Sequence, residues 1–275
     1  MKNDEPLSSL KQIYIIIKYE IDRAWQNKRI LIAISISVIL SLFLLIIIPT
    51  YTAYKEGFFL YQMNWKIYLF YQLFALNYLL FIFPIIFSFN ALSREYEYES
   101  GLTMFIQPIY RETLFFGKLF SSIIIISFLN ILNYLFLTVC YMIVYLSTEA
   151  LLVIFSSFLI YSLASITYIS VTFLINSIVN RGHITVIILV FVVFLLGISF
   201  LPKTDEYLLG PIFSIPYNSF SSIIILDPNE TFFAMLLGMH PDIYPITWIS
   251  ITMLSSYIVI SIIGTGFWEN MKELK

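Results

Sequence analysis

The sequence predicts an all-α membrane protein with six transmembrane helices. Two observations lead to this fold class: 60% of the 275 residues are hydrophobic, and only 12% are charged. A soluble domain carries about 25% charged residues, and an apolar core of this size would need a far larger body to cover it. Soluble enzymes, disordered chains and coiled coils are therefore excluded, and the lipid bilayer is the expected solvent.

Long apolar stretches are the third observation. About 20 apolar residues in a helix cross a hydrocarbon core of about 30 Å. Six stretches qualify, at 30–48, 67–89, 119–146, 150–179, 184–201 and 246–267. We expect Pro49 to end the first and Pro84 to kink the second. The third and fourth form a tight helical hairpin that must tilt or protrude. No domain boundary interrupts residues 1–275.

The positive charges predict how the chain is oriented. With the N-terminus in the cytoplasm, 12 of the 15 Lys and Arg residues lie on the cytoplasmic side, and only Lys55, Lys66 and Lys203 face out. This asymmetry follows the positive-inside rule. Because an even number of spans returns the C-terminus to the cytoplasm, we expect a multi-pass protein of the plasma membrane with both termini inside.

An amphipathic helix is predicted before the first span. Its apolar residues recur at spacings of three and four, namely Leu10, Ile13, Tyr14, Ile17, Ile21, Ala24 and Trp25. Ile15, Ile16 and Tyr19 interrupt the opposite, polar face. We expect this helix to lie along the inner membrane interface with Trp25 at headgroup depth. A cytoplasmic extension of the first span is the alternative.

The predicted cytoplasmic segment 93–118 reads SREYEYESGLTMFIQPIYRETLFFGK. An acidic run is followed by Gly101, by the apolar stretch Leu102–Ile106 and by Gln107-Pro108, and Arg111 and Lys118 close the segment. This order predicts a short helix across the ends of two spans, ending near Pro108. Its apolar side chains would fill a groove on a soluble partner. The alternative is a solvated loop with a chance apolar patch.

The predicted outer segment 202–245 contains two apolar stretches, Ile212–Ile225 and Thr231–Met239, that are too short to cross a membrane. They suit interfacial or re-entrant helices at the outer mouth of the protein. Asn229-Glu230-Thr231 matches a glycosylation acceptor on the outer side.

The six predicted spans contain no Asp, Glu, Lys, Arg or His, the residues on which ion-coupled carriers depend. Asn130 and Asn133, three apart on one face, either hydrogen-bond a neighbouring helix or line a polar route. His183 and His240 are predicted on opposite sides of the membrane. No hydrolytic set of residues, and no metal site, is therefore expected at one depth.

Other functions are excluded by simple counts. A net charge of −2 does not suit a polycationic nucleic-acid binder, so we expect no nucleic-acid partner. Cys140 is the single cysteine and is expected to be a buried hydrophobe. Gly117-Lys118 lacks the glycine frame of a phosphate-binding loop. We therefore expect this chain to be no enzyme and to hold no cofactor, so any work it does must be driven by another polypeptide.

Two stretches together resemble the ABC-2 type family of ABC-transporter permeases. The first is KYEIDRAWQNKR at 18–29, and the second is SREYEYESGLTMFIQPIYRETLFFGKL at 93–119. The residues that match the family pattern are Arg94, Glu97, Glu99, Ser100, Gly101, Pro108, Arg111, Gly117 and Lys118. Six spans, cytoplasmic termini and a long loop before the sixth span extend the resemblance over nearly the whole chain. The chain departs from it at Asp227, where members usually have Asn.

The resemblance implies a role for each of these parts. Residues 1–29 would form the elbow helix, and residues 93–112 would form a coupling helix on separate cytoplasmic nucleotide-binding (ATPase) subunits. The implied ATPase-coupling residues are Arg94, Glu97, Glu99, Ser100, Gly101, Leu102, Gln107, Pro108 and Arg111. ATP and Mg would be held by the ATPase partner. A second permease copy, or a related permease, would face spans one and five.

The expected function is that of the membrane subunit of an exporter. Because the predicted spans are uncharged, an apolar or amphipathic substrate is favoured. The alternative is a non-transporting membrane anchor or assembly factor that recruits cytoplasmic proteins through segment 93–118. An intramembrane enzyme is a third interpretation, with His183 and His240 as the residues to test.

Overall fold

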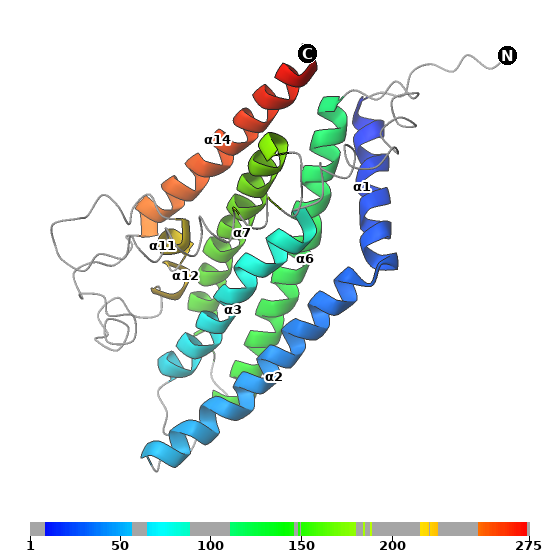
Figure 1. Ribbon diagram of the computed structural model, residues 1–275. Helices are drawn as coiled ribbons and strands as arrows, with labels where there is room; N and C mark the ends of the chain where they lie inside the picture. The colour runs from blue at the N-terminus through cyan, green and yellow to red at the C-terminus, as the bar shows by residue number, and fades with distance from the viewer. Residues whose placement is uncertain are drawn as a thin grey trace.

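A computed structural model describes residues 9–56, 65–88, 111–145, 148, 150–179, 184, 188, 215–219, 221–224 and 247–273. In these ranges the chain is helical and contains no strand (Figure 1). The helices are α1 (Ser9–Gln26), α2 (Arg29–Glu56), α3 (Trp65–Ser88), α6 (Arg111–Tyr145), α7 (Leu151–Val179), α11 (Ile215–Ser219), α12 (Ser221–Ile224) and α14 (Thr247–Glu273).

Three of the described helices are long and apolar enough to cross a membrane. They are Glu112–Tyr145 of α6, Leu151–Val179 and Thr247–Trp268 of α14. The number rises to four if α1 and the first part of α2 count as one bent span. Over the described residues, a helical fold with helices suited to a membrane is thus confirmed, whereas six spans stay a prediction. The predicted fifth span, 184–201, lies outside the described residues except for Ile184 and Ile188.

Two predicted helix boundaries are wrong. α2 continues through Pro49 to Glu56 instead of ending at the proline. Helices in membranes tolerate an internal proline. α6 begins at Arg111, well before the predicted start of the third span at residue 119. Burial explains the earlier start, because Phe115 is 5% exposed and packs edge-on against Phe173 of α7, with ring centroids 6.0 Å apart. Arg111 and Glu112 therefore belong to α6.

α7 is the central helix of the bundle, and α3, α6 and α14 all contact it. Its side chains donate hydrogen bonds to backbone carbonyls of two neighbours. Tyr161 Oη donates to the Leu76 carbonyl of α3 at 2.9 Å. Thr167 Oγ1 reaches the Leu254 carbonyl of α14 at 3.3 Å. Such bonds tie apolar helices together where burial in lipid supplies little preference for one neighbour over another.

The short helices α11 and α12 confirm part of the expectation for the outer segment. α11 contacts α7 and α14, and α12 contacts α7 and α3 (Figure 1). Their polar residues Asn218, Ser219, Ser221 and Ser222 are all buried. These short helices therefore pack among the long helices. The second expected stretch, Thr231–Met239, and Asn229 lie outside the described residues.

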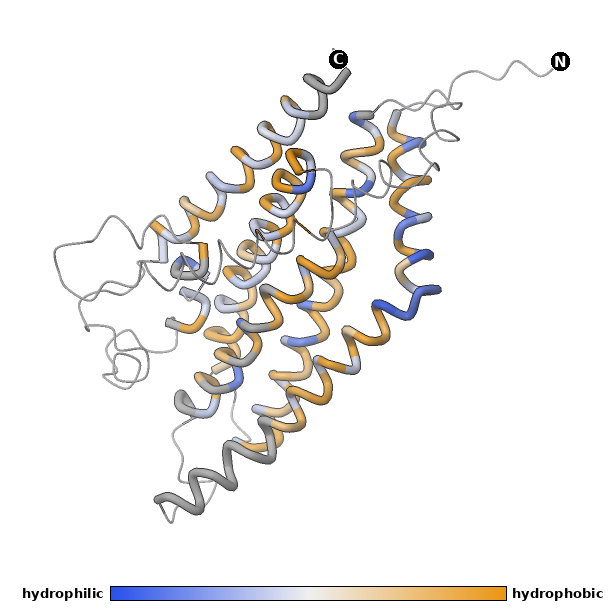
Figure 2. Tube along the Cα trace, in the orientation of Figure 1, coloured by the Kyte–Doolittle hydropathy of each residue, from blue (hydrophilic) through white to orange (hydrophobic). Residues whose placement is uncertain are grey.

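α1 is a helix in its own right. It ends at Gln26, α2 begins at Arg29, and the two helices meet at an angle of 61°. Lys28 between them has a φ of 56°, in the left-handed region that ends a helix. Figure 2 shows that this bend is hydrophilic, while the coloured part of α2 that follows it is hydrophobic. α1 is therefore not a straight continuation of α2.

Candidate functional site

The predicted ATPase-coupling residues fall almost entirely outside the described part of the chain. Arg94, Glu97, Glu99, Ser100, Gly101, Leu102, Gln107 and Pro108 all precede residue 111 and are not described. Arg111 is the first residue of α6. The site that the structure does describe is therefore the junction immediately after the predicted coupling segment, where α1 packs on the first turns of α6.

One face of α1 contacts α6. Gln12, Ile16 and Glu20 follow at four-residue spacing, so they lie one above another on the same side of the helix. At one end of this face, Thr113 Oγ1 donates a hydrogen bond to Gln12 Oε1 at 3.4 Å. The contact joins residues 101 positions apart in the chain. α1 is therefore held against the very turns that follow the predicted coupling segment.

Close backbone approach occurs in the middle of this face, at Gly117. A Cβ placed on Gly117 would lie 2.7 Å from Cγ2 and 2.8 Å from Cβ of Ile16. Real Cβ atoms do not approach other carbons so closely, so only glycine allows this helix spacing. Ile16 is correspondingly buried, with 8% of its surface exposed. The glycine of the Gly117-Lys118 pair thus has a packing role here.

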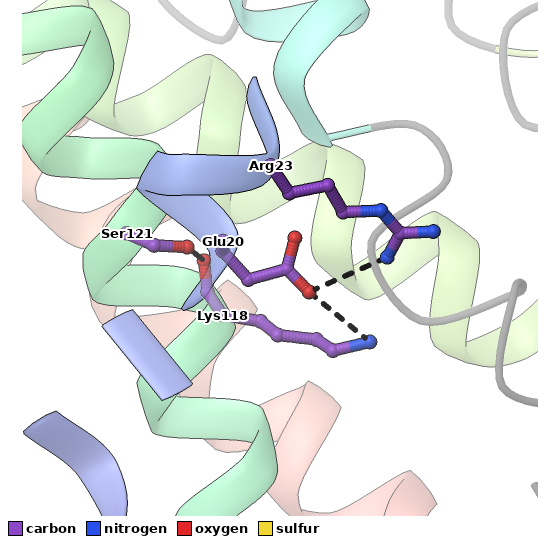
Figure 3. Close-up of polar contacts among 4 residues, drawn as sticks. All are labelled: Glu20, Arg23, Lys118 and Ser121. Carbon is purple, nitrogen blue, oxygen red and sulfur yellow. Dashed lines mark hydrogen bonds and ion pairs between the residues drawn. The ribbon is translucent and has the colours of Figure 1, made fainter. Parts of the chain in front are cut away.

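At the other end of the face, Glu20 lies between two cations. Its Oε1 atom is 3.9 Å from Lys118 Nζ and 4.0 Å from Arg23 Nη1, as Figure 3 shows. The Lys118 side chain is only 3% exposed, whereas that of Arg23 is 34% exposed. A buried ammonium is costly unless it has a charged partner. Glu20 therefore lowers the cost of burying Lys118 and fixes α1 to α6.

A small polar cavity adjoins this ion pair, at the bend between α1 and α2. Its volume is about 40 Å³, room for about three water molecules. The described residues that line it come from α1, the bend, α2, α3 and α6, and they are Glu20, Arg23, Ala24, Asn27, Arg29, Phe87, Lys118, Ser121, Ser122 and Ile125. Three of them are cationic and one is anionic. We refer to this cavity as the elbow pocket.

The amphipathic character of α1 is confirmed, whereas its contact with α6 was not predicted from the sequence. Ile16, predicted to interrupt the polar face, is buried against α6. Leu10, Tyr14 and Trp25, from the predicted apolar face, are 77%, 67% and 54% exposed. Their exposure fits a helix that presents a second apolar side to lipid. The sequence analysis did not identify Glu20 as a contact residue. Its four-residue spacing from Ile16 places it on the same face of α1 and could have indicated that role.

Within the bundle, the structure decides between the two interpretations of Asn130. Its Nδ2 atom donates a hydrogen bond to Ser165 Oγ of α7 at 2.9 Å, and both residues are buried. Ser165 in turn donates to the carbonyl of Tyr161. Asn130 therefore joins two helices, as expected for a polar residue in a membrane interior. Asn133 is buried as well, and its Nδ2 atom has no hydrogen-bond partner among the described residues.

Comparisons with known proteins leave the family open. The chain matches no protein-family model and no curated protein.

Among the described residues, no three His, Cys, Asp or Glu side chains gather as a metal-binding group. Cys140 is buried with 4% of its surface exposed, as the sequence predicted.

Proposed function

We propose that this chain is the membrane-spanning permease subunit of an ATP-binding cassette transporter. In this proposal the chain crosses the plasma membrane six times, with both termini in the cytoplasm. It pairs with a second permease, and separate ATPase subunits hold ATP and Mg. The predicted spans carry no charged side chains, so an apolar or amphipathic substrate is the class that they favour.

The observation that carries the proposal is the junction of α1 with α6. The predicted coupling helix, 93–112, runs into the start of α6 at Arg111, and α6 is 35 residues long, about 52 Å at the rise of an α-helix. Because Gly117 and Lys118 fasten α1 to the same turns, a push on the coupling segment would move α1 and α6 as one body. Such rigid displacement of packed helices is a common way to switch between two states.

The relation of α14 to α1 also supports the proposed topology. The C-terminal end of α14 and helix α1 lie at the same end of the bundle (Figure 1). If both termini are cytoplasmic, these two ends must lie on the same side of the membrane. An even number of crossings places them there.

The test begins with the full chain purified in neutral detergent from its native membranes. We expect an ATPase to co-purify and the complex to hydrolyse ATP faster than the isolated ATPase. Gly101→Pro should return the rate to that of the isolated ATPase, because proline in the predicted coupling helix disrupts it. The matched control is Gly210→Pro in the predicted outer segment, which should retain the stimulation.

Two outcomes would contradict the proposal. One is a chain that functions with no nucleotide-hydrolysing companion. The other is full stimulation in Gly101→Pro. Co-purification of cytoplasmic proteins without ATP-dependent transport in vesicles would favour the membrane anchor or assembly factor instead.

A further inference from the structure

We propose that a groove between α6 and α7 holds one acyl chain of a phospholipid from the membrane leaflet remote from α1. Among the described residues, four side chains of α6 within 131–138 and four of α7 within 151–158 line this groove, whose volume is about 280 Å³. We refer to it as the interhelical groove. The inference rests on its shape, its chemistry and its place along two helices suited to a membrane, and it does not depend on the transport function.

The shape of the interhelical groove suits a hydrocarbon chain better than a helix. Tyr134 and Ile154, each 4% exposed, form its floor, and the more exposed side chains Ile131, Leu135 and Phe155 form its walls. One turn of a helix with its side chains is a cylinder about 10 Å wide and about 5.4 Å long, roughly 400 Å³ in volume. Because that volume exceeds the groove, a helix from a second copy could insert only single side chains. An acyl chain is narrow enough to lie along the floor.

The polar atoms beside the groove already have hydrogen-bond partners. Tyr134 Oη and Ser157 Oγ share a hydrogen bond of 2.9 Å, and Thr138 Oγ1 donates to the Tyr134 carbonyl at 2.7 Å. Among the described residues that line the groove, none is charged. A polar ligand would lose its hydrogen bonds to water here without gaining others. Hydrocarbon is therefore the chemical class that the groove accepts.

The groove lies at the depth of acyl chains when α6 is centred in a bilayer. Both α6 and α7 are long and apolar enough to cross a membrane. Phe128 is the midpoint of α6, and Thr138, the groove residue of α6 farthest from it, follows ten residues later, about 15 Å along the axis. Half of a hydrocarbon core is also about 15 Å thick. Because α1 packs on the first turns of α6, the groove belongs to the leaflet remote from α1.

The interhelical groove is continuous with an apolar surface that faces outward. Phe120, Ile124 and Phe128 of α6 and Leu152 of α7 are all exposed. In a membrane this surface contacts lipid, so the groove opens directly onto acyl chains.

A groove of this kind does not stay empty in a bilayer. Water does not fill it, because apolar cavities stay dry. An empty groove forfeits dispersion contacts along its floor and walls, and a chain that enters recovers them. We therefore expect the chain in the groove to exchange more slowly than chains on the surrounding convex surface.

The test places the full chain in phosphatidylcholine vesicles that contain a phosphatidylcholine with a diazirine at the middle of one acyl chain. After irradiation, mass spectrometry of peptides locates the attached lipid. We expect labelling at Phe155, on the groove wall, to exceed labelling at Leu152, which is more exposed on the same helix but outside the lining. General contact with lipid would give the opposite order.

Ile131→Trp should fill the groove and lower the labelling at Phe155 to the level at Leu152. The matched control is Ile124→Trp, because Ile124 and Ile131 are both 46% exposed on α6 and, of the two, only Ile131 lines the groove. This control should keep the labelling of the wild type. If Ile131→Trp does not fold, as judged by size-exclusion chromatography, Leu135→Trp takes its place.

Native mass spectrometry after washing with detergent provides a second readout. We expect Ile131→Trp to retain one phospholipid fewer than the wild type and Ile124→Trp. Labelling that follows exposure in the wild type, or that Ile131→Trp leaves unchanged, would overturn the proposal. So would a change from dimer to monomer in Ile131→Trp alone, because that result would assign the groove to a second copy of the chain.

Discussion

At the scale of single residues, the spacing of α1 and α6 depends on one missing methyl group. Alanine at 117 would place its Cβ 2.7 Å from Ile16 Cγ2, so the two helices would have to separate. Overpacking of this kind costs about 1–3 kcal/mol. We expect Gly117→Ala to lower the free energy of unfolding by that amount, measured by denaturation in mixed detergent micelles.

Gly266→Ala is the matched control, because a Cβ there meets nothing within 4 Å. It lies in α14, where alanine should instead raise the helix propensity by about 1 kcal/mol. Ile16→Ala should not rescue Gly117→Ala, since the Cβ of residue 16 itself is 2.8 Å from the added atom. Equal stability of the two glycine variants would show that α1 and α6 are not in close contact.

A second residue-scale prediction concerns the hydrogen bond from Asn130 to Ser165, which joins α6 to α7 at 2.9 Å. A double-mutant cycle of Asn130→Ala and Ser165→Ala should give a coupling energy of about 0.6 kcal/mol, the average for such bonds in membranes. Pairing Asn130→Ala with Ser156→Ala supplies the control, because Ser156 is bonded within its own helix on the exposed side. Strict additivity in the first cycle would argue against the bond.

At the scale of elements, the bend between α1 and α2 depends on the left-handed conformation of Lys28, whose φ is 56°. This conformation costs an ordinary residue about 1–2 kcal/mol, and glycine adopts it freely. Lys28→Gly should therefore stabilise the protein by about 0.5–1 kcal/mol. The same substitution at Lys18, inside α1, should destabilise by about 1 kcal/mol. Thermal unfolding of both variants measures the difference.

Both glycine variants remove one exposed lysine, so their comparison isolates the backbone effect from the charge. Lys28→Val provides a third point, because a β-branched residue is strongly disfavoured at positive φ. Destabilisation by Lys28→Gly, or tolerance of Lys28→Val, would mean that the helices do not bend at this residue.

Helix positions were predictable from hydropathy where lipid burial alone determines the helix. α7 runs from Leu151 to Val179, almost the predicted 150–179, and α3 nearly matches 67–89. The start of α6 was missed because contacts from another helix, such as Phe173 on Phe115, stabilise its first turns. The hydropathy pattern of neighbouring residues carries no information about contacts with another helix, so it did not predict this boundary.

The contact face of α1 shows a second limit of sequence reasoning. Both lipid and a neighbouring helix favour apolar side chains, so hydropathy cannot separate Ile16, which packs on protein, from Tyr14, which is exposed. The Gly117-Lys118 pair was noticed through its family pattern. Its partners Ile16 and Glu20 lie about a hundred positions earlier, and only the fold brings them together.

At the scale of the whole molecule, α6 connects the junction to the centre of the bundle. Its first turns hold α1, and its middle bonds the central helix α7 through Asn130. α14 forms a flank, and Ile260, Ile263 and Phe267 are each more than half exposed on it. In a membrane, these side chains would face lipid or another protein. The arrangement therefore places a charged, fastened junction at one end of an otherwise apolar bundle.

The orientation of that bundle is the last prediction. Helix α6 carries the chain from Thr113, which contacts α1, to Tyr145, about 48 Å at 1.5 Å per residue. Exposed Thr148 should therefore emerge on the membrane face opposite Ser9. In a Cys140→Ser background, a membrane-impermeant maleimide is applied to intact cells whose plasma membrane is directly accessible to the reagent. It should label Thr148→Cys before permeabilisation and Ser9→Cys only after it. The wild type is the control, because buried Cys140 should react only when unfolded. Labelling of both positions from one face would refute the crossing by α6, and a reversed pattern would refute the cytoplasmic N-terminus.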